Sequence, residues 1–187
     1  PGPLPAGDPE KLLRQVDVSG DVPASARLQV FVAKALETYT AVQKESAEQP
    51  NFSDFHVHAA VELSDGRWVS APNVELSREV GLCAERTAIL AALANAPAGT
   101  KVKTIVVSNS GGEFKKLCAE CLSWLATGKF FSPDTEIVSV ARDPATGRIG
   151  IRIRALKSIL PFHLGAAHQP SLTDQPVGSL EVAVSPA

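Results

Sequence analysis

The sequence has little of several features that mark whole classes of protein. Its 187 residues hold 18 Lys and Arg against 20 Asp and Glu, so the formal net charge is −2. A charge so close to zero argues against a basic face that follows a phosphate backbone. Aromatic residues are only 5% of the chain, and Trp68 and Trp124 do not form a series of base-stacking platforms. No apolar run approaches the roughly 18–20 residues of a membrane-spanning helix.

Methionine is absent and cysteine is scarce. The start at Pro1-Gly2-Pro3 is therefore expected to be a processed or truncated end, and no basic region followed by an apolar segment marks a signal peptide. The chain has three cysteines, and an odd number does not suit a disulfide framework. We expect a cytoplasmic protein with reduced thiols, which leaves the question of what three thiols do together.

The two ends of the chain differ from its middle. Residues 1–9 contain four prolines and two glycines, and Pro, Gly, Ser and Ala again dominate from about Pro161 onward. Hydrophobic residues make up 44% of the chain, which is enough for a core. We expect an irregular segment over 1–22, one domain over 23–167 and a tail over 168–187.

Hydrophobic periodicity predicts an α/β domain in the middle segment. Apolar residues at helical spacing predict a helix over 24–47, and strict alternation predicts a strand over 55–63 with a returning strand over 67–71. Further patterns predict helices over 82–95 and 117–125 and strands over 102–107, 137–140 and 149–153. This order favours a sheet covered by helices.

The cysteines lie at the starts of two predicted helices. Cys83 opens the first, and Cys118 and Cys121 open the second with the C-x-x-C spacing that lets two thiolates reach one metal ion. Because each helix follows a strand, both helix starts should lie at the same sheet edge, where three thiolates could meet. The lack of a fourth cysteine favours a catalytic site with an open position over a closed structural site. His56 and His58 could ligate a metal, but we expect them to be solvated on the polar face of their strand.

Glu85 follows Cys83 by two residues and has two interpretations. It could be a carboxylate beside the metal that takes and returns protons. It could equally be a first-turn acid that the helix dipole favours. A C-x-E segment followed by C-x-x-C matches the pattern of zinc nucleobase deaminases with Cys in place of His.

Four motifs resemble those of the cytidine deaminase family and occur in the family's order. Cys83–Ile89 (CAERTAI) is similar, residue for residue, to the zinc helix of that family. Phe52–Ala60 resembles its opening strand, Asn73-Val74-Glu75 its ribose-binding pair, and Leu160–Gly165 its closing motif. The resemblance covers about residues 25–167. It implies a three-layer α/β/α sandwich with a mixed five-stranded sheet, and a dimer or tetramer.

The resemblance also implies an activity, namely hydrolytic deamination of free cytidine-like or deoxycytidine-like nucleosides by a zinc-bound hydroxide. One Zn²⁺ per chain is then the cofactor, and a nucleoside of pyrimidine salvage is the partner rather than a nucleic acid or a membrane. The residue roles that it implies are Cys83, Cys118 and Cys121 as zinc ligands, Glu85 as proton shuttle, Phe52, Asn73 and Glu75 as nucleoside contacts, and Arg86 as a charge that offsets the thiolates.

The sequence departs from the family pattern mainly on the side of the base. The loop Asn109 to Lys116 stands where the family should recognise the pyrimidine ring, and Leu164 stands where the family has a closing aromatic residue. Beside the cysteines, Leu117 stands where the family usually has Pro, and Leu122-Ser123 stands where Arg-Gln usually follows the last cysteine, so one donor to the thiolates is missing. Two alternatives therefore stay open. The protein could deaminate another aminated nucleoside or a nucleoside antibiotic, or it could be an inactive zinc-stabilised scaffold. Polynucleotide editing is disfavoured by the neutral charge and the few aromatic residues.

Overall fold

A computed structural model describes most of the chain between residues 16 and 160. The described ranges are 16–21, 23–48, 51–78, 80–114, 116–143, 145 and 147–160. Residues 161–165 of the closing motif and the expected tail over 168–187 lie outside them. Within these ranges, no helix combines the length and the apolar character that crossing a membrane requires.

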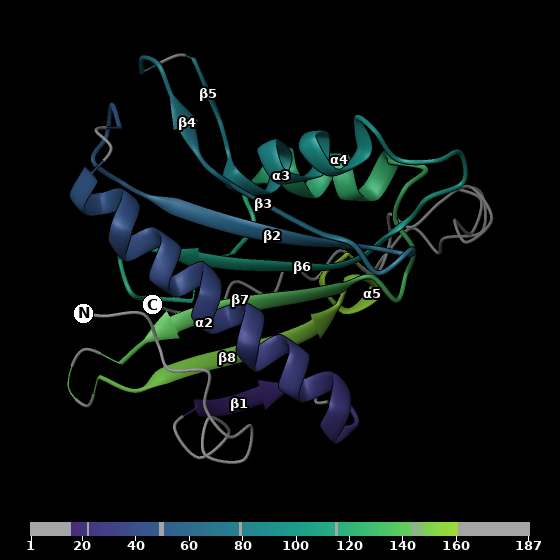
Figure 1. The fold of residues 1–187 in the computed structure, drawn as a ribbon, viewed down its shortest axis with the longest axis horizontal. Coiled ribbons are helices and arrows are strands. Elements are labelled where there is room, and N and C mark those ends of the chain that lie inside the picture. The colour runs from purple at the N-terminus through teal and green to yellow at the C-terminus, as the bar shows by residue number, and fades with distance from the viewer. Residues whose placement is uncertain are drawn as a thin grey trace, which may run out of the picture.

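A mixed six-stranded sheet forms the centre of the structure, in the order β1-β8-β7-β6-β2-β3 (Figure 1). β1 pairs parallel with β8, and β6 pairs parallel with β7, while the other neighbours are antiparallel. The strands are β1 (Val16–Gly20), β2 (Val57–Leu63), β3 (Trp68–Pro72), β6 (Val102–Asn109), β7 (Glu136–Arg142) and β8 (Ile149–Ala155). Two short strands, β4 (Val74–Glu75) and β5 (Gly81–Leu82), pair separately in an arm beside the sheet.

Helices cover both faces of the sheet and complete the expected three-layer α/β/α sandwich. The long helix α2 (Ser25–Glu48) packs on one face, and α3 (Ala84–Leu93) packs on the other with α4 (Ala119–Thr127) beside it (Figure 1). A short helix, α5 (Leu156–Ile159), follows β8 and joins the α3 side. The predicted helices and strands are thus all present, with ends shifted by a few residues.

Strand alternation divides the core between the two faces. Along β6, Ile105 and Val107 point into the cluster under α3, whereas Val106 points into the cluster under α2. Because helices cover both faces of the sheet, seven of the eight β6 residues are buried, and its central residues Ile105, Val106 and Val107 form an unbroken apolar run. On the α2 side, Phe31, Ala35 and Val42 are buried at the i, i+4 and i+11 spacing of one helix face.

β1 is the strand of the six-stranded sheet that hydrophobic patterning did not predict. We expected residues 1–22 to be irregular and the sheet to have five strands, but Val16–Gly20 pairs parallel with β8 as a sixth. Only Val16 is buried in this strand, so its pattern carries little hydrophobic signal. Its partner strand decides its conformation, and a parallel partner 133 positions away (Val16 against Ile149) leaves no local trace in the sequence.

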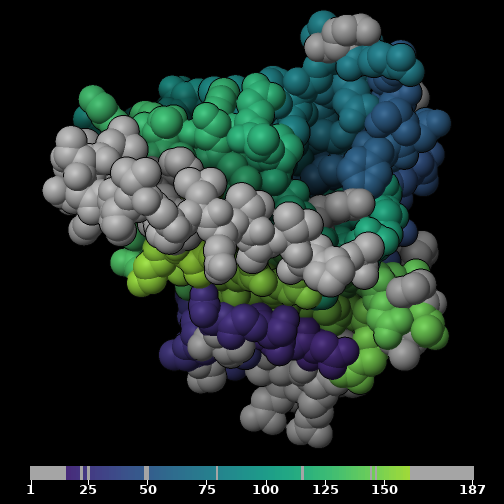
Figure 2. Space-filling model, turned by 180° about the vertical axis from the view of Figure 1, so that it is seen from behind, coloured from purple at the N-terminus to yellow at the C-terminus, as the bar shows by residue number. Residues whose placement is uncertain are grey.

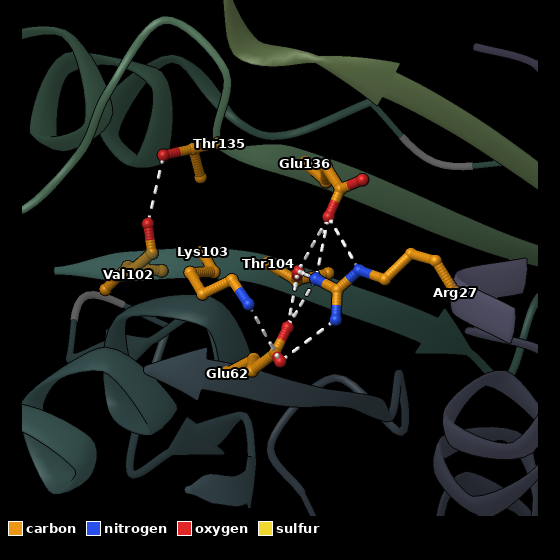
Figure 3. A network of polar contacts seen from close by, with 7 residues as sticks. All are labelled: Arg27, Glu62, Val102, Lys103, Thr104, Thr135 and Glu136. Atoms are coloured by element: carbon orange, nitrogen blue, oxygen red, sulfur yellow. Dashed lines mark hydrogen bonds and ion pairs between the residues drawn. The ribbon is translucent and has the colours of Figure 1, made fainter. Parts of the chain in front are cut away.

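A partly buried polar network joins α2 to the sheet (Figure 3). The Arg27 guanidinium donates to Glu62 Oε1 at 2.9 Å and to Glu136 Oε2 at 3.2 Å, and Thr104 Oγ1 donates to Glu62 Oε2 at 2.9 Å. Burial raises the pKa of Glu62, but the hydrogen bonds from Arg27 and Thr104 outweigh it and leave that pKa below its ordinary value. Two carboxylates from β2 and β7 therefore share one cation from the helix.

Replacing Glu62 is expected to destabilise the fold in a pH-dependent way. Glu62→Gln should lower the free energy of unfolding at pH 7 by about 2 kcal/mol, between the values for exposed and for buried pairs. Because the folded pKa of Glu62 is depressed, its contribution is present above the unfolded pKa and is lost as the pH falls through the folded pKa. Urea unfolding at a series of pH values measures both effects.

The matched control is Glu37→Gln, which removes an ion pair of an exposed carboxylate with Lys34 on the same helix. That change should cost at most about 0.5 kcal/mol at any pH. If the Glu62→Gln variant had the same urea midpoint of unfolding as the wild type, this result would contradict the role given to the network.

Candidate active site

The sheet order brings the starts of α3 and α4 to the same edge. β3 and β6 both run antiparallel to β2, so they run in the same direction and end at that edge. Cys83 is the N-cap residue of α3, and Cys118 is the N-cap residue of α4. The expectation that both helix starts would meet is therefore confirmed.

Three sulfur atoms converge at this edge. Cys83 Sγ lies 3.5 Å from Cys118 Sγ, and the ligand atoms of Cys83, Cys118 and Cys121 all lie within 4.8 Å of one another. A zinc–sulfur bond of about 2.3 Å in a tetrahedral site places two sulfurs about 3.8 Å apart. The three cysteines therefore form a cluster whose donor atoms and spacing fit a metal ion.

The electrostatics of the cluster favour a bound cation. Cys121 donates to Cys83, and this bond together with the facing Arg86 guanidinium outweighs burial and lowers the pKa of Cys83 to about 5. The same bond and the burial of Cys121 raise the pKa of the Cys121 thiol. A metal ion bound between the sulfurs stabilises several thiolates at once.

Glu85 lies in the first turn of α3 and is 7% exposed. Burial raises the pKa of its carboxyl group, and the nearby Cys83 thiolate raises it further. A buried carboxyl group next to a thiolate fits a role in proton transfer, and its place in the first turn of α3 also fits the helix-dipole interpretation. Its environment is the kind that tunes a group for proton transfer.

A pocket of about 690 Å³ opens over these residues. Its wall includes Cys83, Glu85 and Cys118 together with Phe52, whose side chain is 58% exposed. The remaining predicted site residues also line it, namely Asn73, Glu75 and Arg86. The structure therefore gathers in one pocket every predicted site residue except Cys121, which lies beneath it and is 2% exposed.

Asn73 and Glu75 are held by hydrogen bonds to the loop before β2. Asn73 Oδ1 accepts from the Val57 amide at 2.8 Å, and Asn73 Nδ2 donates to the Phe55 carbonyl at 2.9 Å. Glu75 Oε2 accepts from both the amide and the hydroxyl of Ser53, at 2.9 and 2.6 Å. These bonds fix one wall of the pocket. Ser53 was not among the predicted site residues, although it lies in the Phe52–Ala60 segment that resembles the family's opening strand.

The two histidines are not solvated, so that expectation was wrong. His56 is 6% and His58 is 8% exposed. His58 Nδ1 lies 2.8 Å from Glu45 Oε1 on α2, because β2 is an inner strand with both faces covered. The metal-ligand cluster found among the described residues consists of the cysteines and does not include either histidine.

Sequence reasoning also missed two residues that contact Arg86. Glu120 and Trp124 lie on α4, where Arg86 donates to Glu120 Oε1 and its guanidinium carbon lies 5.8 Å from the Trp124 ring centroid. The C-x-x-C motif contains Glu120, but the motif specifies only its two cysteines.

Solved structures share this arrangement of layers. A cytidine deaminase from Burkholderia pseudomallei superposes with a TM-score of 0.52 and 24% sequence identity, over 67% of this chain and 94% of that one. The chain has the cytidine deaminase fold.

Two further cytidine deaminase structures are similar to the chain. Those from Mycobacterium leprae and Mycobacterium tuberculosis give TM-scores of 0.48 each, with 24% and 26% identity. They cover 67% and 69% of this chain and 95% of each of theirs. Neither a protein-family model nor the sequence of a curated protein matches the chain.

The cysteine cluster predicts stoichiometric metal binding. Reduced protein loaded with Zn²⁺ or Co²⁺ is expected to retain one ion per chain, measured by elemental analysis after gel filtration. Cys121→Ser should weaken binding by more than the about 10–100-fold that outer contacts contribute, because it removes a ligand. Ser123→Ala on the same helix is the control. Wild-type affinity in Cys121→Ser would show that the cluster is not the metal site.

Proposed function

We propose that this protein is a zinc-dependent hydrolytic deaminase that converts free cytidine or deoxycytidine to the uridine form. One observation carries the proposal: the buried carboxyl group of Glu85 lines the same pocket as the sulfurs of Cys83 and Cys118. The cytidine deaminase fold supports the same class of reaction. The neutral overall charge supports a free nucleoside as substrate rather than a polynucleotide.

The metal and the protein would make different contributions to the reaction. Cys83, Cys118 and Cys121 would hold a zinc ion, which would act as the Lewis acid that makes water a nucleophile at neutral pH. The protein supplies ligands from two helix N-termini, where the helix dipoles favour thiolate over thiol. The pocket opens on the side of the cluster that faces Glu85 and Phe52, so a substrate can approach from there.

Glu85 moves the protons. Its carboxylate accepts a proton from the attacking water, donates it to N3 of the ring, and carries the second proton to the amine that leaves C4. One water is consumed and one ammonia is released. The burial that raises the pKa of Glu85 helps a carboxyl group to hold a proton between these two transfers.

The sugar lies against the opposite wall. Asn73 and Glu75 face the pocket and are held in place by Ser53 and the loop before β2. Because these side chains are already ordered, less conformational entropy is lost when they bind hydroxyl groups. Phe52, exposed at the rim, packs against the nucleoside.

The partners and the compartment belong to the same proposal. The nucleoside is the small-molecule partner, and a homodimer or homotetramer remains the expected assembly. Three free thiols that serve as metal ligands suit the reducing cytoplasm. Another aminated nucleoside remains the second candidate substrate, because Leu117 replaces the family's Pro at a position that lines the pocket.

Glu85→Gln tests the mechanism. This variant keeps the shape of the side chain but cannot accept the proton, so kcat for cytidine should fall by about 10²–10⁴-fold or more. The loss of absorbance on deamination measures the rate, and elemental analysis should still find one metal ion per chain. The control is Glu48→Gln, an exposed acid at the end of α2, which should leave kcat unchanged.

The substrate panel contains cytidine, deoxycytidine and several other aminated nucleosides. Turnover of none of them by metal-loaded wild-type protein would overturn the deaminase proposal and favour the scaffold. A Glu85→Gln variant that loses its metal and unfolds would instead show that Glu85 is structural.

A further inference from the structure

Arg86 is a buried cation that reaches from one cysteine-bearing helix to the other. It lies on α3 with its side chain 8% exposed. One end of its guanidinium, Nη2, lies 3.7 Å from Cys83 Sγ, and the other end, Nη1, donates to Glu120 Oε1 on α4. The third nitrogen, Nε, is buried and has no hydrogen-bond partner. The contacts of Nη1 and Nη2 therefore determine the orientation of the guanidinium.

Two side chains of α4 contact this cation. Glu120 and Trp124 are four residues apart on the helix, so their side chains lie on the same face. Glu120 binds the guanidinium at its edge, and the Trp124 ring lies 5.8 Å from its central carbon, within the range of a cation–π contact. Glu120 and Trp124 of α4 thus both contact Arg86 of α3.

The contact matters because α4 is otherwise lightly anchored. Its buried residues are Cys121 and Leu125, and Figure 2 shows this region, in green, at the surface of the molecule. Leu125 packs in the core under α3, and Cys121 lies at the sulfur cluster. The contacts with Arg86 therefore make up a substantial part of what fixes the start of α4 relative to α3.

The charges are arranged so that Glu120 does not cancel the effect of Arg86 on the sulfur. The Glu120 side chain is 62% exposed, so water screens much of its charge. Both contacts of the guanidinium are partly buried, but Cys83 is less exposed than Glu120, and charge interactions are stronger where less water is present. Three thiolates and one divalent ion sum to −1, and the guanidinium offsets that excess.

We infer that Glu120 and Trp124 are positioning residues for the metal site, because they hold the Arg86 guanidinium against the Cys83 sulfur. They fix the two helix starts at the separation that three sulfur ligands need, and they take over part of the role of the donor missing after Cys121. This inference rests on the proposed metal site but not on the identity of the substrate.

Cobalt binding tests it directly. Co²⁺ bound to thiolates gives absorption bands that report ligand geometry, and competition with a chelator gives the dissociation constant. Glu120→Ala and Trp124→Leu should each weaken Co²⁺ binding by about tenfold and shift the bands. Glu120→Gln, which keeps the acceptor oxygen, and Trp124→Phe, which keeps a ring, should retain most of the affinity.

Two comparisons separate positioning from mere packing. In an Arg86→Gln background, Glu120→Ala should have no further effect on Co²⁺ affinity, because the group that it positions is gone. The melting temperature of the metal-free protein should change little in Glu120→Ala, as in the control Ser123→Ala. An equal loss of stability with and without metal would show that Glu120 only packs α4, and would overturn the inference.

The remaining outcomes of the cobalt experiment test the inference and the proposed function separately. Wild-type Co²⁺ affinity and bands in both Glu120→Ala and Trp124→Leu would overturn the inference and leave the proposed function intact. A wild-type protein that binds no Co²⁺ would overturn the metal site and this inference together. Metal binding that depends on Glu120 in a protein that deaminates nothing would support the inference while the proposed activity fails.

Discussion

Three sulfur atoms within 4.8 Å of one another are the constraint on which the functional end of this protein depends. Thiolates repel each other at that distance, so a cluster of this kind is stable as three thiolates only when a cation binds between them. The rest of the site follows from this requirement. Two helices must start at one sheet edge, a guanidinium must approach the sulfurs, and a pocket must give access to the remaining side.

The sheet meets this requirement by giving its two faces different tasks. The α3 face carries the sulfur cluster and the pocket. The α2 face carries no predicted site residue, and polar contacts at three places along the helix fasten α2 to the sheet. These are Arg27 with Glu62 near its start, Thr38 with Ser108 in the middle at 2.8 Å, and Glu45 with His58 near its end. Polar contacts of this kind fix the position of a helix more specifically than apolar packing alone.

Polar contacts also fix the position of side chains in the pocket wall. Asn73 and Glu75 both face the pocket and hold the loop that carries Ser53 and Phe55. The side chains proposed to bind the sugar are therefore ordered by bonds within the protein. Arg86 shows the same arrangement at the cysteine cluster, where contacts with α4 hold the group that faces the Cys83 sulfur.

The sequence by itself determined the layers, the helices, the inner strands and the three cysteines that meet at one edge, because each leaves a local trace. Periodicity marks the buried face of α2, and the C-x-E and C-x-x-C spacings mark two helix starts. Only the tertiary structure decided what depends on distant partners. β1 is a strand because β8 lies beside it, His58 is buried because α2 covers β2, and Glu120 meets Arg86 because two helices converge. Such contacts join residues far apart in the chain, and no pattern of neighbouring residues records them.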